Sequence, residues 1–318
     1  MFPSAMQLVG AVLVPVLLGL LVAVPVKVPR GVKGVIAVIL SLAVAFLVTE
    51  EGKIQFPPTD AVHWLLFALP LVLAAGVVDA SLRLWSLWRW GLIGSVSLLL
   101  VVLLSTPWRN NAPGAWADAG VWMAKVPTLA VWGMVGVWTA ATTAVAMSIS
   151  RRFSEIGGAP GAPMMGRWER VSVVISTGLL MAMSGPVLAS AGSALSLPLR
   201  TAALGLPLLG VVAVLVVSRH AKYSTDLRGI GWVVAVLWCA IQLVGMLYFS
   251  LDWWVSLLMV IGTVAAGIAT RLMPADSEKK ALRRGIVCFV LTILPPTAAV
   301  VVSIVRLLSN DTGGSDYY

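Results

Sequence analysis

Two kinds of polar residue interrupt the long apolar segments of this chain, and they are the residues most able to do chemistry there. Gln242 is the one strongly polar side chain near the middle of an apolar segment. Hydroxyl and glycine residues gather in two other segments. Such residues either bond to a neighbouring helix or line the path of a solute. Packing and helix–helix hydrogen bonds are one interpretation, and the other predicts a pathway lined by Thr139, Thr142, Thr143, Ser184, Gly185, Pro186 and Gln242.

Asp79 is followed by Arg83 near the end of an apolar segment. Residues four apart lie on the same face of a helix, so the spacing predicts an ion pair. A proton or ion relay is the alternative, because charges in a membrane segment often mark function. No apolar segment carries a carboxylate near its middle, which disfavours proton coupling through a central Asp or Glu.

Catalytic, metal and cofactor motifs are not found. His63 and His220 fall at opposite predicted membrane faces and cannot share a metal. Cys239 and Cys288 lie in apolar segments without a C-x-x-C partner. The glycine-rich segment 157–166 has part of a P-loop spacing, but Arg and Trp follow where the motif requires Lys and Ser or Thr. We therefore predict no catalytic residue, no metal and no cofactor.

The composition indicates an integral membrane protein. Of 318 residues, 59% are hydrophobic and 11% are charged, whereas soluble domains carry about 25% charged residues. The net charge of +9 is expected of cytoplasmic loops that face anionic lipid, so it does not indicate nucleic-acid binding. The predicted partners are the lipid bilayer and, through basic cytoplasmic loops such as Arg271–Arg284, another protein.

Ten apolar segments are long enough to cross a bilayer as helices, the conformation that satisfies the backbone in lipid. The loops that follow the first, third, fifth, seventh and ninth segments hold 17 of the 22 Lys and Arg residues, and the other loops and both ends hold 5. This alternation predicts an all-α, polytopic transmembrane helix bundle of about ten spans with both termini non-cytoplasmic. The segments are Ala5–Val26, Val32–Thr49, Ala61–Ala80, Trp90–Thr106, Val126–Ser148, Arg170–Leu195, Leu199–Ser218, Ile230–Ser250, Trp253–Met273 and Gly285–Leu307.

The chain is predicted to form a single membrane domain over 1–318. The first five spans occupy 1–150, a cytoplasmic linker 151–169, the second five spans 170–308, and a short polar tail 309–318. Because five is odd, the second half would be inverted relative to the first, an arrangement common among transporters.

Three functions agree with these features. The first is a carrier or channel for a small or amphipathic solute. The second is a non-catalytic subunit or scaffold of a larger membrane complex, and the third is an intramembrane lipid-modifying enzyme. The bacterial cytoplasmic (inner) membrane is the expected location.

Overall fold

The computed structural model describes residues 9–20, 28–49, 61–82, 86–110, 128–156, 167–191, 196–217, 227, 229–249, 251–273 and 277–312. These residues are helical with short connecting segments, and no strand occurs among them. The elements are η1 (Val9–Leu13), α2 (Val14–Gly19), α3 (Arg30–Thr49), α4 (Ala61–Leu82), α5 (Ser86–Asn110), α6 (Thr128–Ile156), α7 (Arg167–Ser190), α8 (Ser196–Val217), α9 (Ile230–Tyr248), α10 (Trp253–Leu272) and α11 (Glu278–Thr312).

Eight of the described helices are long and apolar enough to cross a membrane. Two of the ten predicted spans meet shorter apolar stretches, at Val9–Gly19 and Leu197–Ala213. Most of the rest of the first predicted span lies outside the described residues. The multi-pass helical membrane fold therefore agrees with the structure, while ten spans, the side of the termini and the inverted repeat stay predictions.

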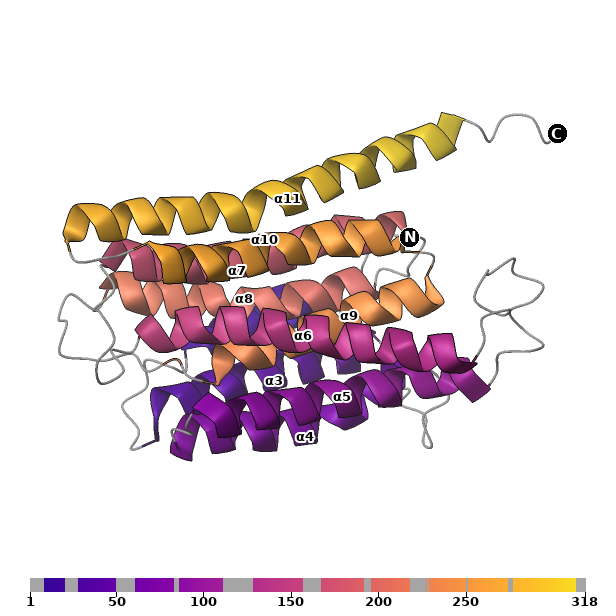
Figure 1. Ribbon diagram of the computed structural model, residues 1–318, viewed down its shortest axis with the longest axis horizontal. Coiled ribbons are helices and arrows are strands. Elements are labelled where there is room, and N and C mark those ends of the chain that lie inside the picture. The colour runs from indigo at the N-terminus through magenta and orange to yellow at the C-terminus, as the bar shows by residue number, and fades with distance from the viewer. Residues whose placement is uncertain are drawn as a thin grey trace.

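Helix α9 lies in the middle of the bundle (Figure 1). It contacts every helix from α3 to α8 and also α10. Between Ile230 and Tyr248, all residues except Met246 and Tyr248 are buried. A helix that is apolar on all sides can be surrounded by protein in every direction, so α9 forms the axis on which the other helices pack.

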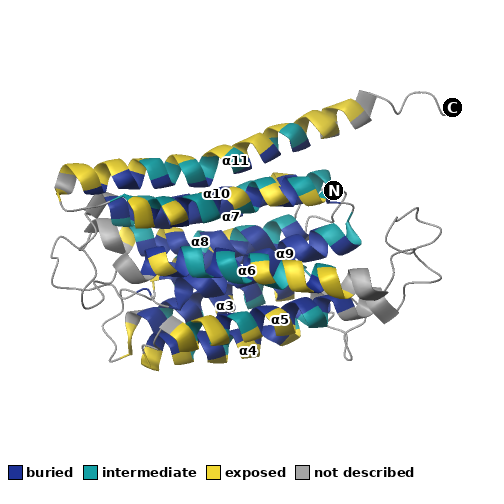
Figure 2. Ribbon diagram, in the orientation of Figure 1, coloured by how far each residue is buried: buried dark blue, intermediate teal, exposed yellow. Residues whose placement is uncertain are grey.

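The outer helices α4, α5 and α11 carry exposed residues on their outer sides, as Figure 2 shows, and many of these residues are large and apolar. Ile286, Val290 and Leu294 of α11 are about half or more exposed, whereas Arg284 and Thr292 on its opposite face are buried. A helix of a soluble protein would show the reverse pattern. This arrangement is stable where the surrounding medium is lipid, so the exposed apolar surface supports the membrane assignment independently of composition.

Several helices approach one another closely at glycine. A Cβ atom on Gly262 of α10 would lie 2.4 Å from the Leu291 carbonyl oxygen of α11. A Cβ atom on Gly19 of α2 would lie 2.1 Å from the Pro207 carbonyl oxygen of α8. Small residues at such crossings are the usual way for membrane helices to gain contact area.

Candidate functional site

The polar residues singled out in the sequence meet around the middle of the bundle, on α6, α7 and α9. Gln242 of α9 is completely buried, and Thr142 of α6 is 3% exposed. Trp138 of α6 and Leu243 of α9 line the same cavity, which has a volume of about 40 Å³. One turn further along α6, Thr142 lies beside the Cys239 thiol of α9. The two helices are therefore antiparallel, and Thr139 lies at the same depth in the bundle as Gln242.

Helix α10 adds a hydroxyl near this depth. The Cβ position of Gly267 is 2.7 Å from the Cβ of Ser148, so α10 packs beside α6. It runs in the same direction as α6, because it follows the antiparallel α9 after a short connection. Counting back from this contact at 1.5 Å per residue places Ser256 within about 3 Å of Thr139 in depth, although Thr139 lies on the face of α6 opposite Ser148. Ser256 is completely buried. We refer to Trp138, Thr139, Thr142, Gln242 and Ser256 together as the polar layer.

The polar atoms of this layer lack partners among the described residues. Neither the amide nitrogen nor the amide oxygen of Gln242 forms a hydrogen bond with them. The hydroxyl groups of Thr139 and Ser256 and the indole N–H of Trp138 are buried in the same condition, whereas the Thr142 hydroxyl has the Cys239 thiol as a neighbour. Each buried polar group without a partner costs roughly 1–3 kcal/mol. Such costs are large against the marginal stability of a folded protein, so a molecule that bonds to these groups would stabilise the layer.

The remaining predicted pathway residues have their polar groups satisfied or carry none. The Ser184 hydroxyl of α7 accepts a hydrogen bond from the indole N–H of Trp238 at 2.6 Å and donates to the Leu180 carbonyl at 3.1 Å. The Thr143 hydroxyl donates to the Thr139 carbonyl at 2.8 Å. Ser184 thus ties α7 to α9 one turn from Gln242.

Helix α7 continues through the Ser-Gly-Pro segment and ends at Ser190. Gly185 is buried, and a Cβ atom there would lie 3.8 Å from the Pro198 Cβ, an ordinary contact distance. Pro186 is exposed on the outside of the helix. The three residues of this segment therefore do not interrupt α7.

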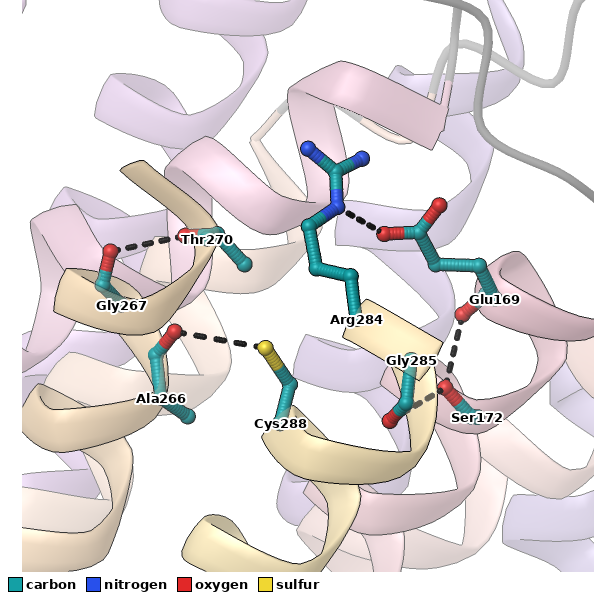
Figure 3. Close-up of polar contacts among 8 residues, drawn as sticks. All are labelled: Glu169, Ser172, Ala266, Gly267, Thr270, Arg284, Gly285 and Cys288. Carbon is teal, nitrogen blue, oxygen red and sulfur yellow. Dashed lines mark hydrogen bonds and ion pairs between the residues drawn. The ribbon is translucent and has the colours of Figure 1, made fainter. Parts of the chain in front are cut away.

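A second polar cluster lies between α7 and α11, where both helices begin (Figure 3). The Arg284 Nε donates to the Glu169 Oε1 at 2.5 Å, and the two side chains are 4% and 2% exposed. The Ser172 hydroxyl has one proton to share between the Glu169 carbonyl of its own helix, at 2.9 Å, and the Gly285 carbonyl of α11, at 3.5 Å. This cluster joins the two helices through charge as well as packing.

Arg152 of α6 reaches deeper into the same group of helices. Its Nη1 donates to the Thr292 hydroxyl at 3.1 Å, and its Nη2 lies 3.4 Å from the Ser176 hydroxyl. Ser176 is nine residues past the start of α7, a depth of about 13 Å. The guanidinium of Arg152, which is 1% exposed, thus points into the bundle rather than out to the surface.

Asp79 of α4 is paired with residues of two other helices. Its Oδ2 accepts hydrogen bonds from Arg89 Nη2 at 2.9 Å and from Trp232 Nε1 at 3.0 Å. Arg83, the predicted partner, lies outside the described residues. The buried Asp79 side chain therefore joins α4, α5 and α9 at one end of the bundle.

The sequence interpretation missed Arg152, Glu169 and Arg284 as buried residues. Arg152 and Glu169 fell in the predicted linker because they lie outside the apolar segments, but α6 and α7 extend past those segments. The signal that could have found them is the i, i+3, i+7 spacing of Glu169, Ser172 and Ser176 on one helix face.

Among the described residues, no three side chains of His, Cys, Asp or Glu come together as metal ligands. Comparison with known proteins gives no assignment: no family model, no curated protein and no solved structure matches this chain.

Proposed function

We propose that this protein is a carrier or channel for a small solute, which passes through the polar layer beside α9. The observation that supports this most is Gln242, whose amide is completely buried and has no hydrogen-bond partner among the described residues. In a bundle that served only as a scaffold, an apolar residue at this position would be more stable. A polar group kept in this state is expected where a passing molecule supplies the missing bonds.

The cavity next to the layer supports the same proposal. It lies between α5, α6 and α9; Ser105 and Trp138 are its polar lining residues, the other six are apolar, and Gln242 is not among them. Its volume of about 40 Å³ gives room for two to four water-sized molecules, since one requires roughly 10–15 Å³ by this measure. This space suits the closed or resting state of a narrow path.

The test is an efflux experiment on purified protein in liposomes. The liposomes are loaded with a mixture of polyols, amides, amino acids, carboxylates and inorganic ions, and the retained contents are measured by mass spectrometry. We expect the wild type to release at least one solute that Gln242→Leu retains. Ile241→Leu is the matched control, because Ile241 is an equally buried neighbour on α9.

Two results would overturn the proposal. One is a wild type that retains every solute as well as protein-free liposomes do. The other is a Gln242→Leu variant that folds and releases the same solutes at the rate of the wild type.

A membrane subunit or scaffold is the second candidate function, and one surface favours it. Arg271 at the end of α10 and Lys279, Lys280 and Arg283 at the start of α11 are all exposed, and they form a basic hairpin suited to an acidic partner. Reversing the charges of Lys279 and Arg283 should then remove a stoichiometric partner from complexes extracted from the native membrane and weighed by native mass spectrometry. Complexes unchanged by this reversal would contradict the scaffold role.

A further inference from the structure

On the helices that form the polar layer, no side chain that is charged at neutral pH lies at the depth of the layer. The sequence contains no Asp, Glu, Lys, Arg or His from 128 to 150 in α6, from 230 to 248 in α9, or from 253 to 270 in α10. The first charged residue of α6 is Arg151, nine residues past Thr142, which is about 13 Å along the axis. The charged side chains described above lie toward the ends of the helices, except that of Arg152, which reaches the depth of Ser176 and Thr292.

The nearest charge in the other direction is Asp252, four residues before Ser256. Its carboxylate is ion-paired with the Arg306 guanidinium, which also lies over the Trp254 ring, and both charged side chains are partly exposed. The two charges offset each other at the surface of the bundle, so they do not supply a counter-ion inside it.

The layer therefore offers hydrogen bonds without charge. Gln242 supplies two N–H donors and one acceptor oxygen, the hydroxyl groups of Thr139, Thr142 and Ser256 can do both, and Trp138 donates. A charged solute would have to leave water for a buried site with no opposite charge, which is strongly unfavourable. A neutral solute with both donors and acceptors would satisfy the groups that have no partner.

Resting on the proposed function, we propose that the solute is a small uncharged molecule that both donates and accepts hydrogen bonds, of the class of urea, small amides and short polyols. Trp138 is the one residue of the polar layer that lines the cavity of about 40 Å³, a space that holds only a few non-hydrogen atoms. Wider solutes would require the helices to separate.

The experiment compares two pairs of solutes that match in shape and differ in charge: urea with guanidinium, and acetamide with acetate. Tracer exchange is measured at neutral pH with equal concentrations on both sides of the liposome membrane, so that no potential develops. The rate in Gln242→Leu liposomes is subtracted, and Thr142→Val serves as a second variant. We expect the neutral member of each pair to exchange at least about a hundredfold faster, equivalent to about 2.7 kcal/mol.

A binding measurement separates this inference from the proposed function. In detergent, acetamide but not acetate should raise the unfolding temperature of the wild type, and neither should raise that of Gln242→Leu. Exchange of guanidinium or acetate at the rate of its neutral partner would overturn the solute class and leave transport standing. If acetamide stabilises the protein but no solute exchanges, the neutral solute class is kept and the transport function is overturned. If no solute stabilises the protein and none exchanges, both the solute class and the transport function are overturned.

Discussion

Replacing Gln242 by leucine should stabilise the protein while it abolishes passage of the solute. The Gln242 side chain is completely buried and its amide has no partner among the described residues. Removing an amide in this condition recovers roughly 1–3 kcal/mol, and leucine fills nearly the same space. If each kcal/mol raises the unfolding temperature of a chain of this size by about 2–4 °C, the increase should be between about 2 and 12 °C.

Ser184→Ala is the matched comparison, because Ser184 is equally buried but fully bonded. Its loss leaves the Trp238 indole N–H, which now donates to it at 2.6 Å, without an acceptor. The expected change is a destabilisation of about 1–3 kcal/mol, the opposite sign to Gln242→Leu. Both variants can be measured by thermal unfolding in one detergent, in the absence of added solutes. A Gln242→Leu variant that loses stability as much as Ser184→Ala does would refute the reasoning, because it would show that the amide is already satisfied inside the protein.

Two further predictions concern the helices around α10 and α11. Glu169→Gln and Arg284→Gln should each destabilise by about 3–5 kcal/mol, because each single change removes one member of a buried charge pair. The double variant should lose clearly less than the sum in chemical unfolding, and strictly additive losses would contradict the pair. Gly262→Ala should cost about 1–3 kcal/mol, since its Cβ would lie 2.4 Å from the Leu291 carbonyl oxygen. The same change at Gly136, where nothing lies within 4 Å, should be neutral or stabilising by up to about 1 kcal/mol, and equal losses at both sites would contradict the close crossing.

Hydropathy predicts the helices, but it does not predict the position of each helix in the bundle. The apolar windows of α4 and α9 are equally hydropathic, yet 44% of the residues are buried in one and 94% in the other. The reason is that lipid and protein interior are both apolar, so hydropathy does not distinguish a helix that faces lipid from one enclosed by other helices. Only the packing of seven neighbours around α9 makes it the central helix.

Within the candidate site, the sequence singled out Gln242 and Thr142, and both are buried, while their role along a pathway stays a prediction. It could not say that Ser184 is bonded and Gln242 is not, because that difference depends on whether Trp238 or another donor happens to reach across from a second helix. Arg152 shows the same limit, since its partner Thr292 is 140 residues away in the sequence. Partners on different helices are decided by three-dimensional packing and leave no local pattern.

The separation of charge from neutral polarity is the strongest argument for a path rather than a rigid support. Buried charges at the ends of the helices are matched by nearby groups, as Glu169 is by Arg284 and Asp79 is by Arg89. The neutral groups of the polar layer are not matched, although an apolar residue at each place would make the bundle more stable. Gln242 is completely buried with both amide atoms open, whereas Glu169 is paired through one carboxylate oxygen and has only the other open, and this contrast fits a site that accepts a neutral molecule at the depth of Gln242. If waters fill the layer permanently, the Gln242→Leu variant will lose stability and passage together, whereas a transient solute predicts that stability rises as passage falls.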